Sequence, residues 1–196
     1  AGDQEAALDM LLGASSEVER TLARRALEKA LSAADPPDEF INSAVLPALD
    51  SAGPETAGAL LAIVGRFPTG KARERVVGML ESGEPQVAEA AIRALSNWPG
   101  TKAVQPLLRV AEQTGSDRLR ALAVRGLIQA IPRSDAPVET LEKVHPHVTT
   151  TGQKKQLLSA LSKAAPSGAL VREIIPMIEQ DEVAREAVVA LAALVQ

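Results

Sequence analysis

Apolar residues recur along the chain with the spacing of amphipathic α-helices. They return at positions i, i+3, i+4 and i+7 within segments that turn residues separate, as at Gly53-Pro54 and Pro99-Gly100-Thr101. About twelve such segments follow one another. Alanine and leucine, which favour helices, dominate them, whereas the β-branched and aromatic runs typical of strands are scarce. The pattern predicts an all-α chain without a sheet.

The predicted helices fall into pairs, and the second helix of each pair carries a similar five-residue apolar core. The second residues of these cores recur after 31, 32, 34 and 30 positions and are Leu61, Ile92, Val124, Leu158 and Val188. A period near 32 with paired helices predicts a solenoid, in which each pair buries its apolar side only by stacking on its neighbours. We expect about six antiparallel pairs in a single domain over residues 1–196. The pair in 1–35 is degenerate and the five in 36–196 are clearer.

The core of this solenoid is expected to be aliphatic, because Phe40, Phe67 and Trp98 are the only aromatic residues. Phe67 and Trp98 each stand three residues past an apolar core, so we expect both to be buried in one column of side chains. Gly126 falls in a core of the same set. A glycine inside a helix costs about 1 kcal/mol relative to alanine, so its presence indicates a close approach between helices.

Prolines and charged residues repeat within the pairs. The first helices of several pairs contain an internal proline, at Pro47, Pro106 and Pro176, and second helices follow an acidic start, as in 117–120 and 181–185. This pattern resembles the HEAT repeat, with its Leu-Pro-type kink in the first helix and its Asp-x-x-Val-Arg-type start to the second. The resemblance covers about residues 36–196, although the pair over 70–99 lacks the proline. It implies a right-handed α-α superhelix, an α-solenoid of the armadillo type.

Solenoids of this kind usually present an extended concave surface to another macromolecule. The runs IRALSNWP, ALAVRGL and QKKQLLSAL are also similar to helical-repeat modules of large bacterial multidomain proteins. These resemblances imply a non-catalytic protein-interaction scaffold or spacer that is part of a longer multidomain bacterial protein. Its expected partner is another protein or a neighbouring domain of the same chain.

Composition argues against several other classes of function. The net charge of −4 argues against a general affinity for phosphate backbones, and the absence of cysteine removes disulfides and iron–sulfur clusters. No apolar run approaches the roughly 20 residues that span a bilayer. The chain as given has no basic-then-apolar leader, which leaves cytoplasm and export within a larger protein both open.

Candidate chemistry is sparse. The only histidines, at His145 and His147, lack the further ligands that a metal site needs at workable spacing. Iron-dependent hydroxylases built from HEAT repeats use His-Glu dipeptides, which this sequence lacks. Trp98 allows an alternative function, a nucleic-acid or nucleobase-handling HEAT-like solenoid with the indole stacked on a base, although core packing is the favoured role. We therefore expect no catalytic residue, metal or cofactor, and no small-molecule substrate.

The last predicted helix, over residues 186–196, is apolar on nearly all sides. A terminal repeat usually carries a polar outer face. We therefore expect the chain to be a stretch of a longer protein in which something covers this helix.

The expected binding surface lies opposite the buried side of the second helices, where it would line the concavity. The middle of this surface is basic in an acidic protein, and its candidate residues are Arg66, Arg93, Asn97, Arg118, Arg125, Gln129 and Lys163. The planar guanidinium groups of Arg93 and Arg125 suit a carboxylate-bearing partner. The alternative is that the arginines only solvate their helices. Arg93 would then pair with Glu89 one turn back, which contributes roughly a few tenths of a kcal/mol.

Overall fold

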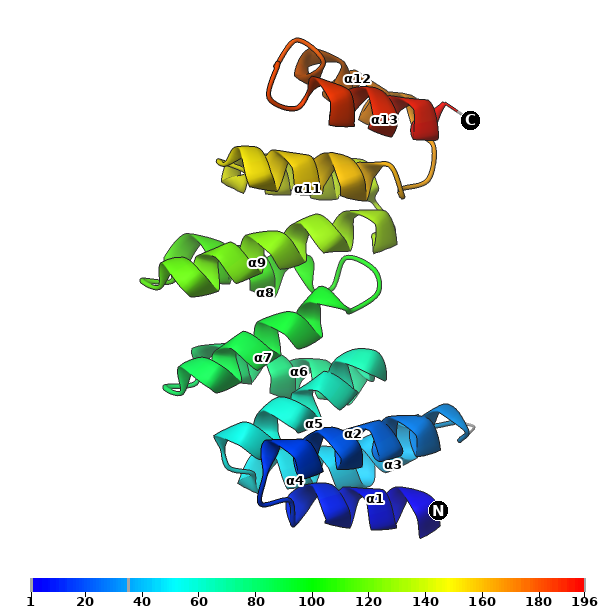
Figure 1. Cartoon of the computed structure of the whole chain (residues 1–196), viewed down its shortest axis with the longest axis vertical. Coiled ribbons are helices and arrows are strands. Elements are labelled where there is room, and N and C mark those ends of the chain that lie inside the picture. The colour runs from blue at the N-terminus through cyan, green and yellow to red at the C-terminus, as the bar shows by residue number, and fades with distance from the viewer. Residues whose placement is uncertain (1, 35, 196) are drawn as a thin grey trace. The chain divides into compact units, whose positions relative to one another are not determined.

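The computed structural model describes residues 2–34 and 36–195, and all regular structure within these ranges is helical, with no strand (Figure 1). The all-α prediction is therefore confirmed. The chain divides into two compact units, residues 1–98 and 99–196. Each unit contains three helix pairs, so the predicted number of six pairs is also confirmed for the described residues.

The first unit is built from three pairs whose second helices, α2, α5 and α7, pack against one another in chain order. Its first pair is α1 (Gly2–Leu12) with α2 (Glu17–Ser32). The second pair is α3 (Asp38–Phe40), a π-helical turn (Ile41–Val45) and α4 (Leu46–Ser51), with α5 (Pro54–Arg66). The third is α6 (Gly70–Gly78), extended by a 3-10 turn (Met79–Glu81), with α7 (Pro85–Ser96).

The second unit repeats this arrangement, with α9, α11 and α13 packed in order as its second helices. Its first pair is α8 (Val104–Gln113) with α9 (Asp117–Ala130), which continues as a 3-10 turn (Ile131–Arg133). The second pair is α10 (Pro137–Val144) and a 3-10 turn (His145–His147), with α11 (Thr151–Leu161). The third is α12 (Gly168–Ile174) and a 3-10 turn (Ile175–Met177), with α13 (Ala184–Leu194).

Of the three prolines that the sequence pattern places in helix middles, Pro106 and Pro176 lie near helix ends, whereas Pro47 lies inside a helical stretch. Pro106 is the third residue of α8, whereas Pro47 directly follows the π-helical turn inside the continuous helical stretch 38–51, as the sequence pattern predicts. An N–H in the first turn of a helix has no intrahelical partner, so Pro106 costs α8 no hydrogen bond, whereas Pro47 lacks an N–H that could bond within its helical stretch. Pro146 and Pro176 lie in the 3-10 turns that end their first helices. Pro146 and Pro176 therefore mark where the α-helical part of their first helices ends.

The aligned core positions show how the pairs share their apolar surface. Leu61, Ile92, Val124 and Leu158 are at most 2% exposed, whereas Val188 on α13 is 53% exposed. In the described residues no further second helix packs on the outer side of α13, so Val188 has no cover there. Phe67 is only half-buried, because α5 ends at Arg66 and the chain leaves helical geometry at Phe67. The prediction that Phe67 lies in the buried column is thus wrong, whereas Trp98 is buried as expected.

The start of α2 is fixed by a reciprocal cap. The Ser16 hydroxyl accepts a hydrogen bond from the Glu19 N–H at 3.2 Å. The Glu19 carboxylate in turn accepts from the Ser15 N–H at 2.7 Å, the Ser15 hydroxyl at 2.8 Å and the Ser16 N–H at 3.2 Å. These donors, the Ser15 N–H first among them, lower the pKa of Glu19.

Acid should weaken this cap. Because the folded-state pKa of Glu19 is depressed, its contribution to stability is present above the unfolded pKa and is lost as the pH falls through the folded pKa. We expect Glu19→Gln to melt at a lower temperature than the parent chain at neutral pH, and the difference to shrink on acidification. Thermal melts followed by circular dichroism would measure it. A difference that grows in acid would contradict the assignment.

Candidate functional site

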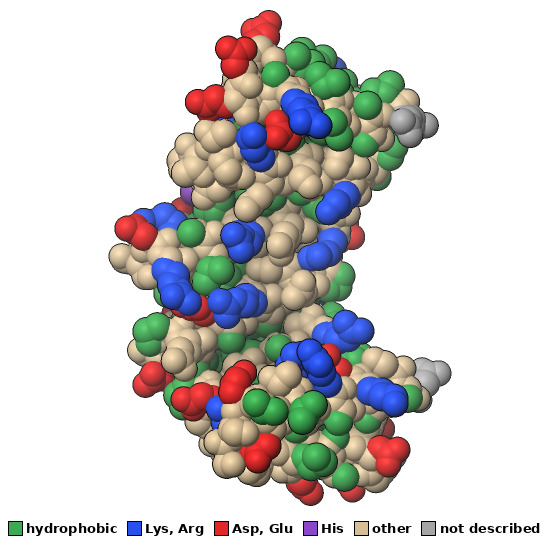
Figure 2. All heavy atoms as spheres, in the orientation of Figure 1, with side chains coloured by type: hydrophobic (Ala, Val, Ile, Leu, Met, Phe, Trp, Pro, Cys, Tyr) green, Lys and Arg blue, Asp and Glu red, His purple; other side chains and the backbone are tan. Residues whose placement is uncertain are grey.

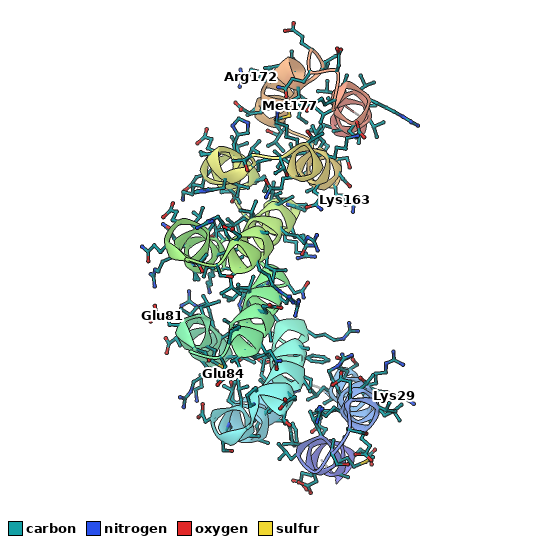
Figure 3. The ribbon with its side chains drawn as sticks, turned by 60° about the vertical axis from the view of Figure 1, so that its left-hand side comes forward. Lys29, Glu81, Glu84, Lys163, Arg172 and Met177 are labelled. Atoms are coloured by element: carbon teal, nitrogen blue, oxygen red, sulfur yellow. The ribbon has the colours of Figure 1, made fainter. Side chains whose placement is uncertain are left out.

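The second helices of both units leave one side exposed to solvent. In the first unit this side carries Arg66, Arg93 and Asn97, all of them exposed, as the sequence pattern predicts. We call the exposed sides of the second helices of one unit its second-helix face. In Figure 3 Lys29 of α2 lies on this side of the first unit, while Glu81 and Glu84, next to the end of α6, lie on the opposite side.

Arg93 is held by its own helix. Its Nη2 lies 3.1 Å from the Oε2 of Glu89, one turn back. The Glu89 side chain is 11% exposed, whereas that of Arg93 is 59% exposed. The pairing weighed as the alternative role of Arg93 is therefore present in the structure. It occupies one of the five guanidinium N–H groups, so the outer edge of the guanidinium can still donate hydrogen bonds.

The other two candidates of the first unit stand at the carboxyl ends of their helices. Asn97 donates from Nδ2 to the carbonyl oxygen of Arg93 at 3.2 Å, which caps the last turn of α7. The guanidinium carbon of Arg66 lies 5.9 Å from the centre of the Phe67 ring, close enough for a cation–π contact. Both contacts orient side chains that still face solvent.

The second unit repeats the arrangement on α9. Arg118, Leu122, Arg125 and Gln129 follow one another at helical spacing along one side, and all but the half-buried Leu122 are exposed. Lys163 follows the end of α11, the next second helix of this unit, and it is also exposed. Figure 2 shows Lys and Arg side chains over α9 and α11, and in Figure 3 Lys163 and Arg172 lie on opposite sides of this unit.

A shallow groove lies between α11 and α13 on the second-helix face of the second unit. Its volume is about 270 Å³, and its lining consists of Leu158, Ser159, Ser162, Arg185, Glu186, Val189 and Ala190. The Glu186 carboxylate lies 3.0 Å from the Lys155 ammonium, and this hydrogen-bonded ion pair is the main reason why the pKa of Glu186 is lowered. Sequence reasoning missed the groove, because it requires the packing distance between two helices.

One of the two histidines contacts a neighbouring helix pair. His147 Nε2 lies 3.6 Å from the Oε1 of Glu112 on α8, and His145 is exposed. Among the described residues no three His, Cys, Asp or Glu side chains come together in a geometry that could hold a metal ion. In the same part of the chain, no helix combines the length and the apolar character that crossing a membrane requires.

Comparison with known proteins places the chain among helical-repeat proteins. A family model described as HEAT repeats matches residues 42–128. The chain has a helical-repeat fold of the HEAT/armadillo type. The match spans α4, α5, α6, α7 and α8 and most of α9, so it includes helices of both units.

Solved structures show the same fold for this helical-repeat protein. An engineered protein shares 20% sequence identity at a TM-score of 0.56, covering 98% of this chain and 96% of its own. A designed armadillo repeat protein in complex with the peptide (KR)4 shares 15% identity at a TM-score of 0.57, covering 99% and 100%. A second designed armadillo repeat protein shares 15% identity at a TM-score of 0.52, covering 98% and 99%. No curated protein gives a significant match.

Proposed function

We propose that this helical-repeat protein is a non-catalytic interaction scaffold that serves as a module of a longer multidomain protein. HEAT and armadillo repeats build rigid stacks whose exposed helix faces bind other macromolecules. The observation that carries the proposal is the exposure of arginine on the second helices of both units, at Arg66 and Arg93 in one and at Arg118 and Arg125 in the other. Within each unit, packed helices that hold such side chains provide a preorganised binding surface.

The sign of the charge favours an acidic partner. A designed armadillo repeat protein of similar fold is in complex with (KR)4, a basic peptide. This chain presents arginines on its second helices, so the complementary ligand is a protein segment rich in Asp and Glu. Guanidinium groups bind carboxylates through two parallel hydrogen bonds, which gives orientation as well as affinity. Arg93 remains able to do so while it is paired with Glu89, because Glu89 occupies a single nitrogen of its guanidinium.

Charge reversal on the second-helix faces tests this proposal. The chain would be used to capture partners from a lysate, with mass spectrometry to identify them, and the affinity of the recovered partner would be measured for Arg93→Glu, Arg125→Glu and the double variant. We expect each single change to weaken binding about tenfold, in the range of exposed interfacial charges. Arg172→Glu on α12 is the matched control, since Arg172 lies on the opposite side of its unit.

Arg93→Lys separates binding from stability, because Arg93→Glu also places a second carboxylate beside the buried Glu89 side chain. Lysine keeps the positive charge but loses the bidentate fork. We expect this variant to melt like the parent chain and to bind the partner more weakly. Unchanged affinity in the double Arg93→Glu/Arg125→Glu variant would contradict the proposal. Recovery of nucleic acid as the bound species would contradict it too.

A further inference from the structure

The groove between α11 and α13 has an apolar floor and polar walls. Leu158 and Ala190 form a floor that is at most 1% exposed, whereas Val189 at its side is 60% exposed. An exposed valine beside a hollow gives an apolar ligand group a surface to cover. The Ser162 hydroxyl donates to the Ser159 carbonyl oxygen at 2.9 Å, so this wall is already ordered by a hydrogen bond.

The rim of the groove is positively charged. Glu186 is neutralised by Lys155 at 3.0 Å. Arg185 has no ion-pair partner within the described residues, and it lies in the first turn of α13, where the helix dipole adds positive potential. The Glu186 carboxylate interacts with both Lys155 and Arg185, so a ligand that enters the groove meets two cations and one carboxylate, a net positive charge next to an apolar surface.

The spacing of Arg185 and Val189 matches that of alternate side chains in an extended peptide. Arg185 and Val189 are four residues apart on α13, which is about 6 Å along the helix axis. In an extended peptide, side chains two residues apart point to the same side and are separated by about 6.6 Å. A peptide lying along α13 can thus place a carboxylate at Arg185 and an apolar side chain against Val189 at the same time.

We propose that this groove binds an extended protein segment in which an acidic residue and an apolar residue are separated by one position. The apolar side chain lies between α11 and α13 on Val189 and Ala190, and the carboxylate pairs with Arg185. The inference rests on the proposed function only in that the ligand is a protein segment. It does not require that Arg93 or Arg125 bind the same segment.

The test uses the whole chain and a fluorescein-labelled synthetic peptide, Glu-Ser-Leu-Ser repeated three times, with fluorescence anisotropy as the readout. We expect saturable binding that weakens about tenfold in Arg185→Glu and about tenfold in Ser159→Leu, which fills the groove. The control peptides replace Glu by Lys or Leu by Ser, and both should bind about tenfold more weakly than the parent peptide.

Two control variants show whether a loss of peptide binding is due to the groove itself. Gln156→Leu adds the same side chain to an exposed position of α11 outside the groove, and Arg172→Glu reverses a charge on α12. Both should bind the peptide like the parent chain, and all variants should keep its circular dichroism spectrum. Absence of binding overturns the inference, as does equal affinity for the leucine-free peptide or for the Ser159→Leu variant.

This experiment and the previous one can fail separately. Capture of a partner that depends on Arg93 and Arg125, with no peptide binding at the groove, supports the scaffold proposal and overturns the groove inference. Peptide binding that depends on Arg185, without any partner affected by Arg93 or Arg125, supports the groove and contradicts the second-helix arginines as the binding site.

Discussion

Replacing Trp98 by alanine is expected to lower the free energy of unfolding by about 3–5 kcal/mol, because it removes the largest side chain of the core and leaves a cavity. Trp98 is 4% exposed in a chain that has only three aromatic residues. The other buried apolar residues of the described chain are aliphatic or methionine, and none has the volume of an indole. Urea denaturation followed by circular dichroism would measure the change.

Phe67→Ala is the comparison variant for Trp98→Ala. Phe67 follows the end of α5, is half-buried, and lies beneath the Arg66 guanidinium. Replacing Phe67 by alanine removes one cation–π contact and less buried apolar area than replacing Trp98 does. We therefore expect Phe67→Ala to lower the free energy of unfolding by less than Trp98→Ala. If Trp98→Ala melted like the parent chain, Trp98 would be exposed in solution and a stacking role in binding would have to be considered again.

The paired fold could be predicted from periodicity because each helix buries one side, and that side repeats with the chain. Leu61, Ile92, Val124 and Leu158 stand at equivalent positions and are all buried. The prediction was wrong where the environment of a residue changes, as at Phe67, which lies beyond the end of its helix. Val188 shows the other limit. Val188 occupies the position in α13 that is equivalent to the buried residues of the other second helices, but no described helix packs over it.

The exposure of the candidate surface was predictable for the same geometrical reason. Residues such as Arg93, Arg125 and Gln129 lie opposite the buried side of their helices, and they are exposed in the structure. Contacts between pairs could not be predicted, since they depend on the distance and rotation between helices far apart in sequence. Lys155 with Glu186 is one example, and the groove that Glu186 lines is another.

Two helices of the first unit, α5 and α7, approach each other closely at Gly65 of α5. A Cβ atom at Gly65 would lie 2.7 Å from the Cα and 3.1 Å from the carbonyl oxygen of Ala94 on α7. These are backbone atoms of a packed helix, so they cannot move without shifting α7. Glycine is required here because α5 and α7 touch backbone to backbone.

Gly65→Ala is therefore expected to destabilise the protein by about 1–2 kcal/mol. Overpacking costs about 1–3 kcal/mol, and the better helix propensity of alanine offsets up to about 1 kcal/mol of it. Gly58 provides the matched control in the same helix, since a Cβ there would meet only the Ala90 Cβ at 3.9 Å. Gly58→Ala should raise the melting temperature by its propensity gain alone. Opposite shifts for the two variants in thermal melts would demonstrate the close contact, and a stabilising Gly65→Ala would show that α5 and α7 lie farther apart.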